Sequence, residues 1–133
     1  MVPGGHIEPF ENQIEAAIRE TREETGLDIK FFSFLHERNE VNDSDWLLPP
    51  EYFFQQLIPA TSNVEAHYHL DFAYLAFSKD LDFSFNTNET KDIKWVDLEE
   101  ALNYDLFDGT RFIIKNISNK FKNNDKFLFM QGK

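Results

Sequence analysis

The clearest structural and chemical signal in the chain is the stretch GHIEPFENQIEAAIRETREETGL, residues 5–27. Its second half carries Glu20, Glu23 and Glu24, spaced so that a helix would place all three carboxylates on one face. Like charges at that spacing destabilise an isolated helix. A compensating cation is therefore expected. A hard divalent ion that takes oxygen ligands and substrate phosphates, such as Mg2+, is the natural candidate.

The same stretch has the features of a helix over residues 12–25. Asn12, followed three residues later by Glu15, resembles a capping box, and Gly26 supplies the left-handed residue that commonly ends a helix. The apolar stripe between these ends consists of Ile14, Ala17, Ile18 and Thr21. The glycine pair that ends at Gly5 predicts a tight turn in which a backbone carbonyl can approach an ion.

This stretch resembles the signature of the Nudix hydrolases, in which glycine, glutamate, Arg-Glu, Glu-Glu and glycine recur at fixed spacings. The signature positions are occupied here by Gly5, Glu11, Arg19, Glu20, Thr21, Glu23, Glu24, Gly26 and Leu27. One position departs from the pattern, because Thr21 stands where the family prefers Ile, Leu or Val. A solvated acidic helix face would account for the glutamates, but not for the glycines, Glu11 and Arg19 at set distances. The false-positive risk of short motifs is therefore small here.

The resemblance implies an α/β fold, a Nudix-like α/β/α sandwich whose mixed sheet lies between the signature helix and the C-terminal helices. It also implies hydrolysis of the pyrophosphate of a nucleoside diphosphate linked to another moiety. The implied cofactor is Mg2+, with Mn2+ as an alternative. Its implied ligands are Glu20, Glu23, Glu24 and the carbonyl of Gly5. Glu11 and Arg19 would form a supporting ion pair.

The catalytic base implied by the resemblance is one of the signature glutamates, Glu20 or Glu23, or a glutamate in a later loop. Family members often carry such a residue before a strand that ends in Trp and an aliphatic residue. Glu89 is the best local candidate and Glu65 the second. The alternative for both is a plain surface charge, because loop glutamates are mostly solvated.

Composition limits the class of protein. A chain of 133 residues predicts a single domain over residues 1–133, and a net charge of −11 disfavours nucleic-acid binding. Cysteine is absent, which excludes disulfides and thiol catalysis and is compatible with the cytoplasm. No apolar run is long enough for a membrane span. The composition therefore predicts neither nucleic acid nor a membrane as a partner, and the resemblance implies a small nucleotide.

Residue patterns predict further elements along the chain. Strands are expected over residues 27–34, 67–77, 81–85 and 93–96, with an added strand at 127–129. Helices are expected over residues 50–57 and 97–103, and after the break at residues 108–110. Pro50 favours the first of these helices because proline suits the first helical position. Asp97 and Glu100 resemble a capping box for the second helix.

Two groups outside the signature are candidates for substrate binding. His67 and His69 fall on one face of their strand and predict a polar surface beside the substrate cleft. A transition-metal site made by these histidines and Asp71 is the alternative. Tyr52 belongs to an aromatic group over residues 46–54 that predicts core or dimer contacts. Its alternative role is a wall on which a nucleobase stacks.

The signature begins at Gly5, whereas the family normally carries strands before it. We expect an N-terminally truncated Nudix-like domain with an open strand edge and a bare apolar face. Such a surface predicts a homodimer in which the segment 46–57 or the C-terminal tail covers the gap. The alternative function is a Nudix-fold nucleotide-binding or regulatory module with little or no catalysis.

Overall fold

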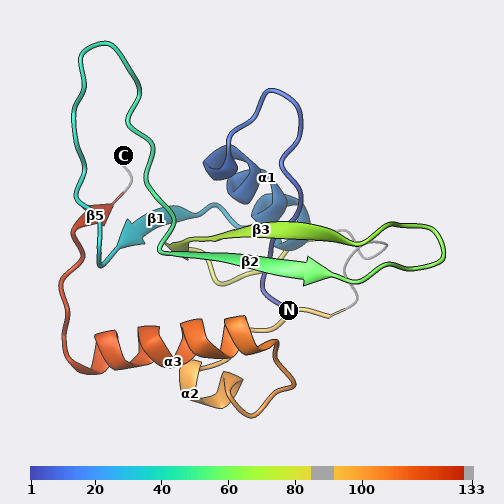
Figure 1. Cartoon of the computed structure of the whole chain (residues 1–133). Helices are drawn as coiled ribbons and strands as arrows, with labels where there is room; N and C mark the ends of the chain where they lie inside the picture. The colour runs from blue at the N-terminus through green and yellow to red at the C-terminus, as the bar shows by residue number, and fades with distance from the viewer. Residues whose placement is uncertain (85–91, 131–133) are drawn as a thin grey trace.

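The structure is a computed structural model that describes residues 1–84 and 92–130. Its helices are α1 (Gln13–Thr25), α2 (Leu98–Ala101) and α3 (Asp108–Lys122). Its strands are β1 (Lys30–Ser33), β2 (Tyr52–Ile58), β3 (His67–Ala73), β4 (Leu75–Phe77) and β5 (Phe129–Met130). The strands form a sheet in the order β4-β1-β5 and a β2-β3 hairpin, and the ladders of these described strands are antiparallel. Figure 1 shows α1 on one side of the strands and α2 and α3 on the other.

Strand β1 has large apolar side chains on both of its faces, and each face is covered by a helix. Successive residues of a strand point to opposite faces. Phe31, only 2% exposed, packs toward α1 in a group with Leu48, Phe129, Ile14, Ala17 and Ile18. Phe32 points the other way and packs toward α3 in a group with Phe34, Leu75, Ile113 and Ile117. The predicted α/β fold with helical layers on both sides of the strands is confirmed. The single mixed sheet is not found among the described strands, which form two sheets with antiparallel ladders because consecutive strands pair through the β2–β3 hairpin.

Helix α1 begins and ends as its sequence predicts. The Oδ1 atom of Asn12 accepts from the N–H groups of Ile14 at 3.0 Å and Glu15 at 2.9 Å. The Glu15 carboxylate accepts from the Asn12 N–H at 2.9 Å, which completes the capping box. Gly26 ends the helix with a φ of 74°. A Cβ at Gly26 would also collide with the backbone carbonyl of Ser84, so this position requires glycine for two reasons.

The helix predicted over residues 50–57 is wrong, because this segment forms strand β2. It pairs with β3 along its whole length, from Tyr52 opposite Ala73 to Ile58 opposite His67. Aromatic and β-branched residues favour this arrangement, and their cross-strand contacts outweigh the preference of Pro50 for a helix start. Helix α2 is shorter than the predicted 97–103, and the Asp97 side chain makes no capping hydrogen bond.

The strand predicted over residues 67–77 is present but divided at Tyr74. Its first part, β3, pairs with β2, and its second part, β4, pairs with β1. This division connects the hairpin to the three-stranded sheet. The strand predicted over residues 27–34 is confirmed in shorter form as β1, at residues 30–33.

The strands predicted at 81–85 and 93–96 do not form in the part of the chain that the structure describes, and residue 85 lies outside it. The two segments meet through side chains instead. The rings of Phe83 and Trp95 stack with centroids 5.5 Å apart. The indole N–H of Trp95 donates to the Leu81 carbonyl at 2.8 Å.

A buried carboxylate joins the sheet to the hairpin. Glu51 is 6% exposed and accepts hydrogen bonds from the Ser33 hydroxyl at 2.6 Å and the Phe34 N–H at 3.0 Å. Buried charged groups are stable only when hydrogen-bonded in this way. The contact fixes the end of β1 against the start of β2.

The C-terminal tail packs within its own chain. Strand β5, predicted at 127–129 and found at 129–130, pairs with β1, and Phe129 is 9% exposed. The Phe127 ring lies 4.6 Å from that of Phe32. In residues 1–84 and 92–130, the helices are too short or too polar to cross a membrane.

Candidate functional site

Arg19 occupies the centre of the polar face of α1. Its guanidinium donates to both Glu11 oxygens, with Nη2 to Oε1 at 2.7 Å and Nε to Oε2 at 3.1 Å. This forked pair is a strong, orientation-specific contact. Arg19 Nη2 also donates to the carbonyl of His6 at 3.0 Å. The helix is thereby fixed to the segment that precedes it.

The contact between Glu11 and Arg19 stabilises the charged form of both side chains. The hydrogen bonds from the Arg19 side chain and from the Glu8 N–H hold the pKa of Glu11 below its usual range. The hydrogen bonds to Glu11 and Glu20 raise the pKa of Arg19. Both side chains are mostly covered, with 14% of Glu11 and 22% of Arg19 exposed. The pair therefore stays ionised at neutral pH.

The signature glutamates are partly neutralised by the same arginine. Arg19 Nη1 donates to Glu20 at 2.7 Å and to Glu23 at 3.2 Å. Glu24 accepts from the Gly4 N–H at 3.3 Å. The repulsion between the carboxylates that the sequence predicts is reduced in the structure, because the positively charged Arg19 side chain lies between Glu20 and Glu23. Among the residues described, no three His, Asp or Glu side chains are grouped in a way that could hold a metal ion.

Gly5 and the Glu20 carboxylate lie close together. A Cβ at Gly5 would collide with the Glu20 carboxylate, so only glycine allows the carboxylate to lie there. The set formed by this carboxylate, its neighbours on α1 and the Gly5 backbone presents oxygen ligands, which are the ligands that Mg2+ and Mn2+ prefer. The donor chemistry therefore fits a divalent ion of this class.

His67 and His69 lie beside the loop that precedes α1. The ring of His69 meets that of His6 edge-on, with centroids 5.7 Å apart. The Nε2 atoms of His67 and His69 are 3.1 Å apart, and His67 Nδ1 lies 2.8 Å from the Glu65 carbonyl. Because a carbonyl only accepts, Nδ1 of His67 carries the hydrogen there. In neutral rings, His67 Nε2 then accepts from His69 Nε2. Sequence reasoning missed His6, whose place next to Gly5 was the available signal.

Tyr52 lies at the other end of the hairpin. Its hydroxyl donates to Asn116 Oδ1 at 2.6 Å, which ties β2 to α3. Burial, and secondarily the charge of Glu51, raises the pKa of Tyr52. The register places Tyr52 opposite Ala73, whereas His67 is opposite Ile58. The structure thus brings His67 and His69 to the signature, but not Tyr52.

The remaining sequence candidates are placed as follows. Glu89 lies outside the described residues. Glu65 has an exposed side chain and contributes its backbone carbonyl to His67. Asp71 shares the strand face of the two histidines and is exposed. A transition-metal triad with Asp71 gains no support, since no such group is found among the described residues.

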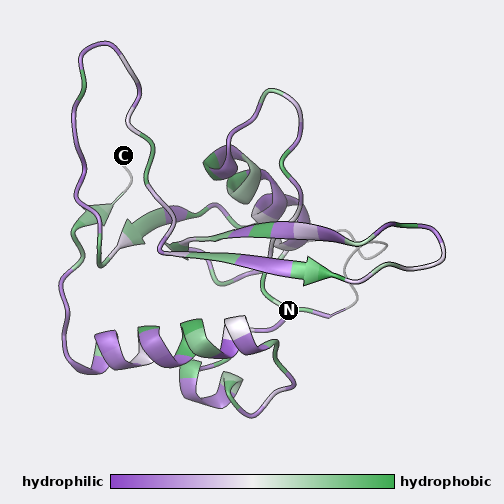
Figure 2. Cartoon of the chain, in the orientation of Figure 1, coloured by the Kyte–Doolittle hydropathy of each residue, from purple (hydrophilic) through white to green (hydrophobic). Residues whose placement is uncertain are grey.

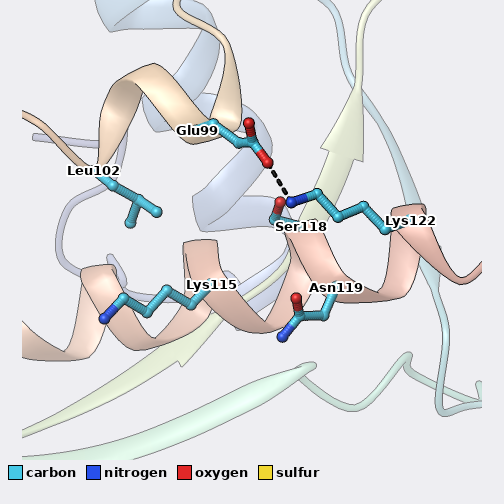
Figure 3. A pocket seen from close by; sticks show the side chains of 6 residues that line it. All are labelled: Glu99, Leu102, Lys115, Ser118, Asn119 and Lys122. Atoms are coloured by element: carbon cyan, nitrogen blue, oxygen red, sulfur yellow. Dashed lines mark ion pairs between the residues drawn. The ribbon is translucent and has the colours of Figure 1, made fainter.

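A surface cavity lies away from the signature, between α2 and α3. Its volume is about 340 Å³, and Figure 3 shows its lining of Glu99, Leu102, Lys115, Ser118, Asn119 and Lys122. Lys122 and Glu99 form an ion pair, and this contact lowers the pKa of Glu99. None of the signature glutamates contributes to the cavity, so it is separate from the candidate site.

Comparison with known proteins adds matches in family, sequence and structure. The family model described as NUDIX domain matches residues 1–117. A crystal structure of a NUDIX family hydrolase from Clostridium perfringens aligns with a TM-score of 0.63 and 26% identity, over 90% of this chain and 78% of that one.

Two curated relatives carry the name bis(5'-nucleosyl)-tetraphosphatase [asymmetrical]. The Mus musculus protein is 46% identical over 41 residues, which is 30% of this chain and 28% of the relative. The Sus scrofa protein is 26% identical over 115 residues, which is 85% of this chain and 65% of the relative. The chain therefore spans less than two thirds of the length of each.

Proposed function

The chain belongs to the Nudix family, and on this premise we propose that it is a Nudix pyrophosphohydrolase. Water is added across a P–O–P bond of a nucleoside diphosphate linked to another moiety. One bridging P–O bond breaks, and a nucleoside monophosphate and a phosphorylated second product form. The observation that carries this proposal is the constellation on α1, in which Arg19 holds Glu11 and Glu20 while Glu20 lies against Gly5.

The curated relatives suggest which substrates to try first. Both are named for hydrolysis of a bis(5'-nucleosyl) tetraphosphate, and one of them aligns with 115 residues of this chain. We propose dinucleoside polyphosphates as the leading class. ADP-ribose, nucleotide sugars and modified nucleoside triphosphates complete the panel.

The proposed cofactor is Mg2+, with Mn2+ as an alternative, held by Glu20, Glu23, Glu24 and the Gly5 carbonyl. When bound, such an ion neutralises the diphosphate and lowers the pKa of coordinated water. The role of Arg19 is to keep the forked bond to Glu11 and so hold α1 against the loop at Gly5. The base that takes the proton from water is proposed to be Glu20, Glu23 or Glu89.

Substrate contacts are proposed on the face of the β2–β3 hairpin that carries His67, His69 and Tyr52. His67 and His69 lie beside the signature through the contact of His69 with His6, and the His69 Nε2–H that donates to His67 would turn to a phosphate oxygen when substrate binds. Tyr52 shares this face at its far end, where its ring stacks with Phe54 at 6.5 Å. It is the candidate for contact with the nucleoside.

The proposed assembly is a homodimer that acts on a small nucleotide in the cytoplasm, with neither nucleic acid nor a membrane as partner. The net charge of −11 supports the exclusion of nucleic acid, because such binding depends on Lys and Arg. A chain without cysteine is compatible with a reducing compartment.

A second candidate function is a nucleotide-binding module without turnover. One observation favours it: Arg19 donates to Glu20 and Glu23, which are two of the carboxylates that would bind the metal. Incubating the purified chain with the substrate panel and Mg2+, and analysing the products, separates the two functions. Release of a nucleoside monophosphate supports the hydrolase. Nucleotide binding in calorimetry without any product supports the module.

A further inference from the structure

The outer face of the β2–β3 hairpin is apolar and exposed. We define this hairpin face by the cross-strand pairs Phe53–Phe72, Gln55–Leu70 and Leu57–Tyr68. Strand alternation places these side chains on the side opposite to the one that carries His67 and His69. Phe53, Leu57, Tyr68, Leu70 and Phe72 are 57%, 55%, 62%, 54% and 39% exposed. The Phe53 and Phe72 rings stack with centroids 4.8 Å apart.

We propose that a second copy of this chain docks on the hairpin face, with the two hairpins facing each other across a two-fold axis. Figure 1 shows the hairpin extending beyond the neighbouring elements, and Figure 2 shows apolar stretches along both of its strands. The inference rests on the dimer of the proposed function and names its surface. It does not depend on the reaction.

The area of the hairpin face agrees with a dimer contact. A large aromatic side chain presents roughly 200 Å² when fully exposed. Three aromatic side chains and two smaller leucines, each about half exposed, therefore offer at most roughly 500 Å² per copy. Two copies would bury at most about 1,000 Å², which is the size of a small, weakly associating interface. A contiguous apolar patch of about 500 Å² is in the range of the largest patch on a typical monomer, and such patches are often functional.

The polar composition of the hairpin face favours a copy of the chain itself. The chain carries a net charge of −11, so two copies repel each other least when they meet through surfaces without acidic groups. The hairpin face has no charged residue. Its polar groups are the Tyr68 hydroxyl and the Gln55 carboxamide, and Gln55 lies between the flanking pairs. A carboxamide both donates and accepts, so two Gln55 side chains related by a two-fold axis satisfy each other.

The C-terminal tail, which was the other predicted cover, is already used within the chain. Phe129 pairs with β1 and is 9% exposed, and Phe127 packs on Phe32. The segment 46–57 therefore provides the dimer contact through its last strand, β2. Trp46 takes no part, because its ring packs on Phe129 at 5.5 Å.

Sedimentation equilibrium at micromolar concentration tests the hairpin face directly. We expect a dimer for the parent, and a monomer for Phe53→Glu because two like charges would meet across the axis. The control is Val64→Glu, at a residue that is 52% exposed in the hairpin turn and off the face. It should remain a dimer. Circular dichroism confirms that all three chains are folded.

Cross-linking locates the contact independently. Because the chain has no cysteine, Gln55→Cys introduces a unique thiol, and Gln56→Cys places one on the opposite side of the same strand. Packed sheets lie about 10 Å apart, so a thiol-specific cross-linker about 10 Å long should link two Gln55→Cys chains to each other. It should not cross-link Gln56→Cys chains. A monomeric parent, a dimer that survives Phe53→Glu, or equal linking of both cysteine variants would overturn the inference. Hydrolysis is not a readout here, so failure of the hairpin face is distinguishable from failure of the reaction.

Discussion

Replacing Gly5 with alanine perturbs the candidate site at one point, and the chain supplies a control one residue earlier. A Cβ at Gly5 would lie 2.6 Å from Glu20 Oε2, and closer still to the other two carboxylate atoms. A Cβ at Gly4 would have no atom within 4 Å. Of the glycines in the described residues, Gly26 is the one with a positive φ, so alanine strains the backbone at neither Gly4 nor Gly5.

The size of the effect follows from the displacement of the carboxylate. Ordinary van der Waals contact begins at 3.4 Å, so Glu20 Oε2 has to retreat by at least about 0.8 Å. Metal–ligand distances tolerate only about 0.2 Å. A misplacement of about 1 Å at a reacting centre costs roughly 100-fold in rate. This corresponds to about 2.7 kcal/mol of transition-state stabilisation.

The assay compares kcat/KM for the parent, Gly5→Ala and Gly4→Ala at saturating Mg2+, together with thermal melts. We expect a loss of roughly 100-fold for Gly5→Ala, near-parent activity for Gly4→Ala and similar melting temperatures for all three. Calorimetry should show weaker Mg2+ binding in Gly5→Ala. Parent-level turnover by Gly5→Ala would refute the assignment of Gly5 and Glu20 to the site. An equal loss in both variants would mean that the loop, and not the carboxylate, was disturbed.

Three further predictions follow from the same contacts. Because the pKa of Glu11 is lowered on folding, its stabilising contribution is present above the unfolded value of about 4.3 and is lost as the pH falls through the lower folded value. In urea titrations, the free energies of unfolding of the parent and Glu11→Gln should therefore converge at acidic pH. A difference between them that does not change with pH would contradict this role. Mg2+ should raise the melting temperature of the parent more than that of Glu23→Gln, and a flat response at millimolar metal would count against the site. Phe129→Ala should cost about 3–5 kcal/mol of folding free energy, and Leu128→Ala, at a residue that is 45% exposed, much less. Similar losses would show that the tail is not packed.

Helix α1 could be predicted almost to the residue because its signals are local. The capping box of Asn12 and Glu15 and the left-handed Gly26 act within the helix's own first and last turns. Strand β2 could not be predicted in the same way. Its conformation depends on pairing with β3, so the local preference of Pro50 for a helix start was a misleading guide.

The same distinction applies to the candidate site. The ion pair of Glu11 and Arg19 was implied by the resemblance of one short segment, whereas the contact of Arg19 with Glu20, which was expected to bind a metal, was not predicted. The contact between His6 and His69 joins the signature loop to the hairpin, and its existence depends on how the hairpin sits on the sheet. The buried carboxylate of Glu51, which fixes that junction, likewise carries no local sequence signal.

The most direct test of the proposed chemistry is hydrolysis of a bis(5'-nucleosyl) tetraphosphate by the purified chain and by Glu23→Gln. Glu40→Gln, at an exposed loop glutamate, serves as the matched control. We predict Mg2+-dependent release of a nucleoside monophosphate by the parent and by Glu40→Gln. For Glu23→Gln we predict a rate lower by about 100-fold or more, because a metal ligand is lost. Parent-level turnover by Glu23→Gln, or nucleotide binding without product from any member of the substrate panel, would contradict metal-dependent hydrolysis at this site.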